Sequence, residues 1–181
     1  GHHITNHYRE AYGIFACCGI LFNHESPLRG LEFVTRKITS TLARIKFKKT
    51  NLLKLGNISA KRDWGFAGDY VEAMWLMLQQ KEPNDYVIST GESHSVEEFL
   101  SLATEFAGLG DWHDFVKIDQ SAMRPTDIED LVGDSSIAQK QLNWKPKTSF
   151  HELVKMMVEY DIDFEKLHID PLEFNKKSQE N

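Results

Sequence analysis

Polar side chains gather in one short segment, Asn23-His24-Glu25-Ser26, and Arg29 follows three residues later. A carboxamide, an imidazole and a guanidinium are groups that hydrogen-bond sugar hydroxyls and cofactor phosphates. The segment comes directly after an apolar run, residues 14–22, and open α/β sheets bind their ligands beyond the carboxyl ends of such strands. The alternative is a loop whose Asn and Ser only satisfy nearby backbone groups. Position favours a ligand-binding loop, although spacing alone does not exclude the alternative.

Two arginines, Arg62 and Arg124, each lie beside turn-forming residues. A guanidinium makes forked hydrogen bonds to phosphate oxygens, so two separated arginines suit a diphosphate. For either arginine alone, a solvated or salt-bridged position is the ordinary alternative. Asp127 follows Arg124 by three residues and fits an ion-pair partner or a helix cap equally well.

Other pairs of reactive residue types have simpler explanations. His3 and His7 have helical spacing, but no third metal ligand stands nearby in sequence, so we predict no metal site. Asp63 and Asp69 could be paired carboxylates for acid/base chemistry, yet a turn former and a helix N-cap explain them more simply. The chain has no G-x-G-x-x-G or G-x-x-x-x-G-K-S/T phosphate loop and no G-x-S-x-G nucleophile motif.

Composition sets the class of protein. The chain has 181 residues, of which 41% are hydrophobic and 27% charged, enough for one domain with a core. The formal net charge of −6 argues against a general nucleic-acid surface. Cys17 and Cys18 are adjacent in an apolar run, a poor place for a structural disulfide, so reduced, buried thiols are expected. With no membrane span and no signal peptide, we expect a cytoplasmic protein, and Gly1-His2-His3 is compatible with a tag remnant.

The elements that must position the candidates begin with a helix. Residues 4–12 are typical of the last turns of a helix, ended by Gly13. The apolar run 14–22 lacks alternation, which predicts a strand covered on both faces of a parallel sheet. Residues 31–47 carry a helical apolar stripe, so an amphipathic helix leads out of the polar loop.

The rest of the chain alternates short strands and helices. Extended pieces are predicted at residues 52–57 and 61–64, and a strand at residues 86–90. Helices are expected after Asp69 as N-cap, after a capping box formed by Ser95 and Glu98, and from near Ser135 and Ser149. Beyond about residue 167 the chain is polar, and we expect a frayed tail.

Several strings taken together resemble a known family. They are Tyr8-Arg9-Glu10-Ala11-Tyr12-Gly13, the segment from Gly19 to Gly30, Arg62-Asp63-Trp64-Gly65, the segment from Asp69 to Trp75, Arg124-Pro125-Thr126 and Leu142-Asn143-Trp144-Lys145-Pro146. In this order the sequence closely resembles the GDP-mannose 4,6-dehydratases, which belong to the extended short-chain dehydrogenase/reductase group. The resemblance runs from Ile4 to about Asp161.

The resemblance implies a fold and a domain organisation. The fold expected is α/β, namely the last part of an NAD(P)-binding Rossmann-type parallel sheet plus the smaller mixed α/β substrate-binding domain. Residues 1–30 would end the Rossmann-type domain with a helix end, a buried strand and a ligand loop. Residues 31–166 would mainly bind the GDP-sugar, with some returning Rossmann elements, and residues 167–181 would form a polar tail.

The resemblance also implies an activity. Members of the family convert GDP-mannose to GDP-4-keto-6-deoxymannose and water with bound NADP, on the route to GDP-fucose. Relatives associate as dimers or tetramers, so a homo-oligomer is expected, with no nucleic-acid partner and no membrane association.

The site residues implied by the resemblance fall into two groups. His24 and Arg29 look like cofactor contacts, with Arg29 suited to a phosphate of NADP. The GDP-mannose contacts would be Asn23, Val34, Lys37, Arg62, Arg124 and Asp127. Asp127 stands where relatives carry Glu, one methylene longer, so that contact is the weakest match. Leu28 and Phe66 also depart from the family pattern, and the segment 108–119 is short.

None of the catalytic residues of the family has a counterpart here. The family's Thr, Glu, Tyr and Lys precede the segment that Ile4 to Tyr12 resembles, so we expect this chain to be inactive alone. The first interpretation is part of a complete dehydratase. The alternatives are a noncatalytic GDP-sugar-binding or assembly module, and a related nucleotide-sugar epimerase.

Overall fold

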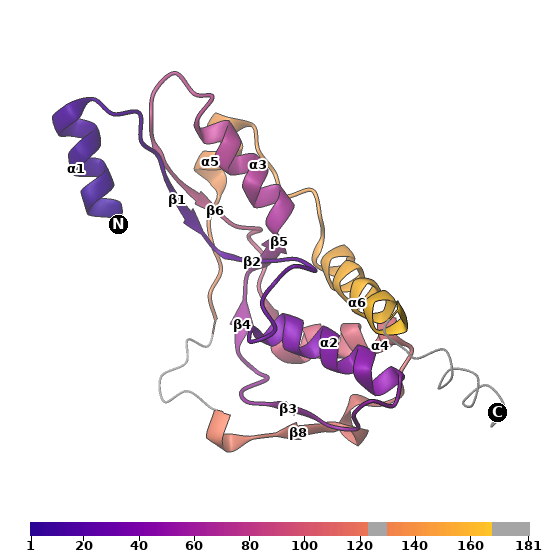
Figure 1. Ribbon diagram of the computed structural model, residues 1–181. Coiled ribbons are helices and arrows are strands. Elements are labelled where there is room, and N and C mark those ends of the chain that lie inside the picture. The colour runs from indigo at the N-terminus through magenta and orange to yellow at the C-terminus, as the bar shows by residue number, and fades with distance from the viewer. Residues whose placement is uncertain (123–129, 168–181) are drawn as a thin grey trace. The chain divides into compact units, whose positions relative to one another are not determined.

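The computed structural model describes residues 1–122 and 130–167. The chain forms two compact units, each built from three segments (Figure 1). The first unit comprises Gly1–Ser26, Ser59–Ser95 and Thr126–Leu153. The second comprises Pro27–Ile58, Val96–Pro125 and Val154–Asn181. Leu167, the first residue of the predicted polar tail, is the last residue of a helix, and the rest of the predicted tail lies outside the described residues.

The first unit begins with helix α1, His2–Tyr12. Gly13 ends it in the left-handed conformation, with φ 63°, and its N–H donates to the Arg9 carbonyl at 3.0 Å. The predicted helix end at Gly13 is therefore confirmed, because glycine adopts this conformation without a Cβ penalty. Arg9 ties the helix to the unit through a hydrogen bond from Nε to the Ala16 carbonyl at 2.7 Å and an ion pair with Asp85.

Strand β1, Cys18–Leu21, pairs in parallel with β6, Asp85–Ile88. The predicted strand in residues 14–22 is confirmed as a member of a parallel pair, although it is shorter than the apolar run. The prediction that it is covered on both faces is wrong for this chain, because Ile20 keeps 47% of its surface exposed. An apolar run without alternation shows that the side chains are apolar on both faces of the strand. Whether they are buried depends on other elements that pack against those faces.

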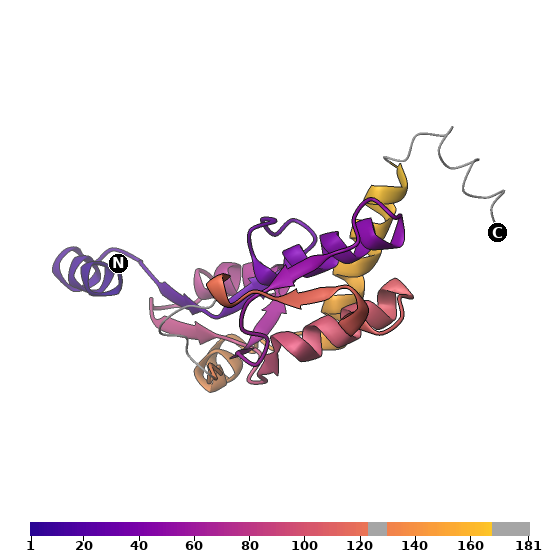
Figure 2. The same cartoon turned by 90° about the horizontal axis from the view of Figure 1, so that it is seen from below.

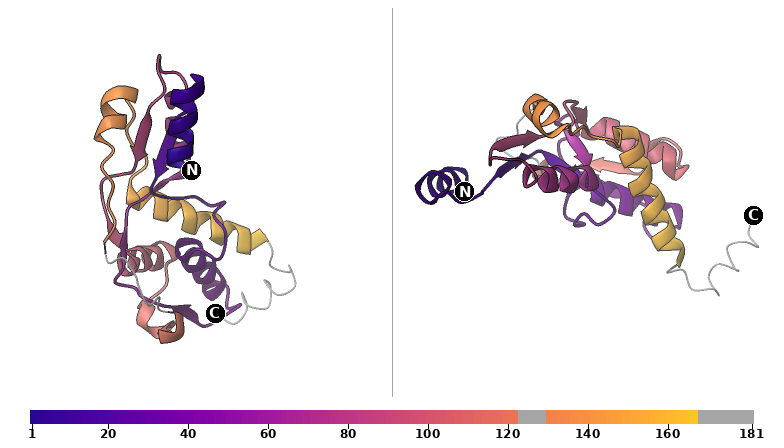
Figure 3. Two further views of the ribbon diagram at one scale, coloured as in Figure 1. Left: turned by 90° about the vertical axis from the view of Figure 1, so that its left-hand side faces the viewer. Right: turned by 90° about the horizontal axis from the view of Figure 1, so that it is seen from above.

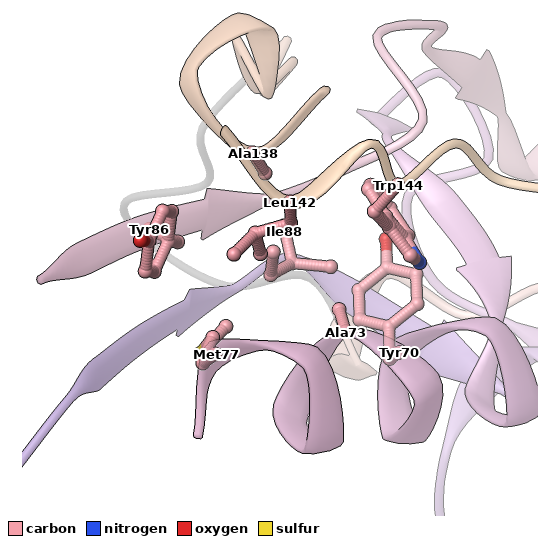
Figure 4. Packing of buried hydrophobic residues seen from close by; sticks show 8 residues of the cluster. All are labelled: Tyr70, Ala73, Met77, Tyr86, Ile88, Ala138, Leu142 and Trp144. Atoms are coloured by element: carbon pink, nitrogen blue, oxygen red, sulfur yellow. The ribbon is translucent and has the colours of Figure 1, made fainter. Parts of the chain in front are cut away.

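The core of the first unit lies between the β1–β6 pair and two helices, α3 (Ala67–Met77) and α5 (Ser136–Leu142). Figure 4 shows the packing. The buried residues of this cluster are Tyr70, Ala73, Met77, Tyr86, Ile88, Ala138, Leu142 and Trp144. The Trp144 indole N–H donates to the Asp69 carbonyl at 2.8 Å, so the large ring is buried with its polar atom satisfied.

Helix α3 corrects one prediction. Asp69 is not its N-cap, because the helix already begins at Ala67 after Phe66. The Asp69 carboxylate instead accepts hydrogen bonds from the backbone N–H groups of Lys147 and Thr148, both at 3.0 Å. An acidic residue in the first turn also suits the helix dipole, so the same sequence signal fits either position.

Two further strand pairs complete the first unit. Strand β2, Asn23–Glu25, runs parallel to β5, Trp64–Phe66. Strand β4, Lys61–Arg62, runs antiparallel to β7, His94–Ser95. These short strands carry three of the predicted site residues.

The second unit packs helix α2, Val34–Lys46, against α4, Val96–Ala107 (Figure 2). Strand β3, Leu53–Leu55, pairs in parallel with β8, Val116–Ile118. The predicted helix at residues 31–47 is confirmed but begins three residues later.

Two short 3-10 helices accompany these elements, at Trp112–Asp114 and Gln120–Ala122. Helix α6, Phe150–Leu167, is uninterrupted in both views of Figure 3 and contributes its later turns to this unit. No helix within residues 1–122 and 130–167 has the length and apolar character needed to cross a membrane.

Candidate functional site

His24 has its orientation fixed by the strand pair that carries it. It lies on β2 opposite Gly65 of β5. The His24 Nδ1 atom is 2.9 Å from the Phe22 carbonyl, which can only accept, so Nδ1 is the donor. In the neutral imidazole, Nε2 is then left as an acceptor. Asn23, the predicted substrate contact, precedes it on the same strand and is half-buried.

Tyr70 supports the His24 ring. The two ring centroids are 5.2 Å apart, and Tyr70 is fully buried. Burial raises the pKa of the Tyr70 hydroxyl well above its usual value, and the negative charges of Asp63 and Asp69 add to this shift. Tyr70 therefore stays neutral and serves as an aromatic support.

Gly65 allows the Tyr70 ring to lie close to the backbone of β5. A Cβ at this position would lie 2.4 Å from Tyr70 Cε2 and 2.8 Å from its hydroxyl oxygen. Only glycine leaves room for the ring at its present distance. The Arg-Asp-Trp-Gly string thus has a packing reason for its last residue.

Arg62 lies on β4 opposite His94 of β7. Its Nη1 donates to the Lys61 carbonyl at 2.6 Å, and the residue is half-buried. The Arg62 backbone is held in place because it is paired in a strand and because the following residue, Asp63, is hydrogen-bonded to other segments.

Asp63 is a buried carboxylate whose function sequence reasoning missed. Its Oδ1 accepts from the Thr90 N–H at 2.8 Å and from the Thr90 hydroxyl at 2.7 Å. Its Oδ2 accepts from the N–H groups of Gly91 at 2.9 Å and Gly133 at 3.2 Å. Four donors fill the carboxylate, so Asp63 joins three chain segments. A buried carboxylate needs such donors, but these lie 27, 28 and 70 residues away in sequence, so no local sequence pattern reports the role of Asp63.

In the second unit, Arg29, Val34 and Lys37 lie within nine residues of sequence. The Arg29 guanidinium carbon is 3.5 Å from the centroid of the Phe33 ring, a cation–π contact. Helix α2 begins at Val34 without a side-chain cap, and the Lys37 N–H is already bonded to the Phe33 carbonyl at 2.8 Å. The N–H groups before Lys37 form the positively polarised end of the helix, which favours anions. Lys37 lies one turn beyond Val34, on the same side.

Six of the predicted site residues are thus described. Asn23, His24 and Arg62 belong to the first unit, and Arg29, Val34 and Lys37 to the second. The predictions for Arg124 and Asp127 lie outside the described residues. Within the first unit Arg62 offers a cation, and within the second unit Arg29 and Lys37 offer cations, the kind of group that hydrogen-bonds phosphate oxygens.

One cluster outside these residues has metal-binding atom types. One ligand atom each from His2, Cys18 and Asp85 lies within 4.8 Å of the others, among the residues that the structure describes. Burial opposes the charge on Asp85, but hydrogen bonds from Arg9, the Cys18 N–H and His2 outweigh it and lower its pKa to about 2. The carboxylate is already neutralised by Arg9 and works as an anchor for α1.

Comparison with known proteins decides the family. The sequence profile of the family described as GDP-mannose 4,6 dehydratase matches residues 1–157. The chain belongs to this family. It is 59% identical over 165 residues to GDP-mannose 4,6 dehydratase 1 of Arabidopsis thaliana, and 47% identical over 178 residues to the Homo sapiens GDP-mannose 4,6 dehydratase. These matches cover 91% and 88% of this chain but 45% and 47% of the two proteins. The chain therefore spans about half the length of the curated relatives it matches.

Solved structures confirm the predicted fold class. RMD from Pseudomonas aeruginosa, complexed with NADPH, matches with a TM-score of 0.81 at 20% identity, over 90% of this chain and 53% of that chain. The UDP-glucose 4-epimerase of Thermus thermophilus, complexed with NAD, matches with a TM-score of 0.73 at 25% identity, over 88% and 50% of the two chains. This chain is an α/β portion of an extended short-chain dehydrogenase/reductase, with parallel strand pairs.

Proposed function

We propose that the gene product carrying this chain is a GDP-mannose 4,6-dehydratase, which converts GDP-mannose to GDP-4-keto-6-deoxymannose and water with NADP. The observation that carries the proposal is the family match over residues 1–157, which includes the polar loop after β1. Support for a nicotinamide cofactor comes from RMD, whose structure contains NADPH.

His24 and Arg29 are proposed to hold the cofactor. Arg29 carries a charged fork that suits a phosphate group, and His24 presents its Nε2 acceptor toward hydroxyl or amide donors. When bound, NADP would accept a hydride from the sugar and return it within the same reaction cycle. The residues of this chain supply binding and orientation.

The residues that the family resemblance names as GDP-mannose contacts are proposed for that role. The Asn23 amide can donate to and accept from a sugar hydroxyl, and Arg62 offers a guanidinium for the diphosphate. Lys37 adds charge next to the polarised start of α2, with Val34 as an apolar neighbour. Arg124 and Asp127 complete the proposed set. None of these residues is a base for the sugar C4 hydroxyl, so we predict no turnover by the isolated chain.

Organisation in the cell is part of the proposal. We place the protein in the cytoplasm as a homo-oligomer, a dimer or tetramer. We also retain residues 1–30 as the end of the Rossmann-type domain, residues 31–166 as mainly substrate-binding, and residues 167–181 as a polar tail.

The test is incubation of the full-length gene product with GDP-mannose and NADP+, followed by mass spectrometry of the nucleotide sugars. A dehydratase yields a product lighter by one water. A product of unchanged mass would favour a nucleotide-sugar epimerase. Binding of GDP-mannose without any product would favour a noncatalytic module and contradict the proposal.

A further inference from the structure

A buried ion pair joins α2 to α6 in the second unit. The Arg36 guanidinium donates to Asp161 through Nε at 3.1 Å and through Nη2 at 2.6 Å, one bond to each carboxylate oxygen. The side chains are 11% and 3% exposed. Such a two-bond contact fixes the guanidinium plane as well as its position. The Thr39 hydroxyl also donates to Asp161, at 2.7 Å.

The third guanidinium nitrogen of Arg36, Nη1, does not contact Asp161. Nη1 donates to the backbone carbonyl of Arg29 at 2.9 Å. Arg29 is therefore held at two points, at its carbonyl by Arg36 and at its guanidinium by the Phe33 ring. A buried carboxylate on α6 thus sets, through one guanidinium, where the backbone of Arg29 lies relative to the start of α2.

We propose that Arg36, oriented by Asp161, is a positioning residue that fixes Arg29 for binding the phosphate-bearing cofactor. This inference rests on the proposed function, because it takes Arg29 to be a cofactor contact. Arg36 itself touches no ligand in this scheme. Its effect on binding passes entirely through the Arg29 carbonyl.

Arginine is required for this task because its nitrogens diverge in one plane. Lysine in place of Arg36 would keep a cation next to Asp161, but a single ammonium cannot match the fork and also reach the Arg29 carbonyl. The Arg36→Lys variant therefore separates charge neutralisation from loop positioning.

The chain contains a matched control. Lys49, after α2, forms an ion pair with Glu165 of α6 at 2.6 Å, and so links the same two regions. Neither residue is part of the proposed binding site. Lys49→Ala should weaken the contact of this region with α6 without moving Arg29.

The test measures the Kd for NADP+ and the midpoint of thermal unfolding in the full-length gene product. We expect Arg36→Lys to raise the Kd about tenfold, a coupling typical of residues in one hydrogen-bond network, and Lys49→Ala to leave it unchanged. The kcat at saturating NADP+ and GDP-mannose should stay near the wild-type value in both variants. Equal effects of the two variants on Kd, or none, would overturn the inference and leave the proposed function intact.

A second variant guards against a folding defect. Arg36→Met combined with Asp161→Leu replaces the pair with apolar side chains, a change that often preserves stability. We expect this double variant to keep the weakened NADP+ binding, because the bond to the Arg29 carbonyl is absent. Wild-type affinity in a stable double variant would contradict the inference. Failure of the wild-type protein to bind NADP+ would overturn the proposed function and the inference together.

Discussion

Two buried carboxylates, Asp63 in the first unit and Asp161 in the second, are satisfied by different kinds of donor. The four bonds to Asp63 come from three backbone N–H groups and a threonine hydroxyl. Asp161 accepts from the Arg36 guanidinium and the Thr39 hydroxyl. Both carboxylates hold a segment that carries predicted site residues.

The difference determines what each carboxylate controls. Asp63 fixes backbone directly, including Gly91 in a left-handed conformation with φ 84°, so its geometry is spread over several segments. Asp161 accepts from two side chains of α2, Arg36 and Thr39, and Arg36 passes the constraint on to a single carbonyl, that of Arg29. Changes at Asp63 should therefore alter several segments of the first unit, whereas changes at Asp161 should act on one loop.

Removing the Arg36 cation, which pairs with Asp161, should have the largest effect on the free energy of unfolding. Arg36→Met leaves the Asp161 carboxylate buried without its counter-ion, and we expect a loss of about 4 kcal/mol in the free energy of unfolding. Urea denaturation of the full-length gene product measures it. Adding Asp161→Leu should recover most of the loss. A single variant as stable as the wild type would show that the pair is not essential to the packing of α2 and α6.

Asp63→Asn should cost slightly less. The amide keeps one acceptor oxygen but turns an NH₂ group toward N–H donors, for an expected loss of about 3 kcal/mol. Hydrogen exchange should speed up at the amides of Thr90, Gly91 and Gly133, which donate to the carboxylate. Asp161→Asn is the control, and should leave these three amides protected. Equal exchange rates at these three amides in the two variants would contradict the distinction between Asp63 and Asp161.

Gly65→Ala tests the support under His24 within the first unit. The new Cβ would press on the Tyr70 ring, and we expect about 2 kcal/mol of destabilisation from overpacking. Gly110→Ala is the matched control, because nothing lies within 4 Å of its Cβ position. Thermal unfolding compares the two. Equal stability of the variants would mean that Tyr70 shifts freely.

Asp85 should give the smallest effect, and one that depends on pH. Its pKa of about 2 lies below the ordinary value of 3.8, so its contribution is complete above pH 4 and is lost as the pH falls toward 2. Asp85→Asn should cost about 1 kcal/mol at neutral pH and remove that part of the acid dependence. Glu72→Gln, which breaks the exposed pair with Lys147, should do less. An unchanged acid profile in Asp85→Asn would contradict this assignment.

The sequence predicted elements better than it predicted contacts. Gly13 as a helix end and the start of α4 at Val96 follow from local backbone preferences, which a short window of sequence contains. Asp69 was misassigned because an acidic residue suits both an N-cap and a first turn. The roles of Asp63 and Arg36 depend on Gly133 and Asp161, 70 and 125 residues away in sequence, which no local pattern reports.

The candidate site was predictable to a similar extent. The resemblance named His24 and Arg29, but not the Tyr70 ring or the Arg36 guanidinium that hold them, because those partners act through packing and hydrogen bonds. The exposure of Ile20 could not be predicted either, because the apolar pattern does not show which elements pack against the strand.

The most direct test of the account compares nucleotide sugars, since solved relatives of the same fold include a UDP-glucose 4-epimerase and a dTDP-glucose 4,6-dehydratase. The full-length gene product would be incubated with GDP-mannose, UDP-glucose or dTDP-glucose at equal concentration with NADP+, and the products followed by mass spectrometry. We predict that GDP-mannose alone gives a product lighter by one water. Preferential conversion of UDP-glucose or dTDP-glucose, or a product of unchanged mass from GDP-mannose, would contradict the account.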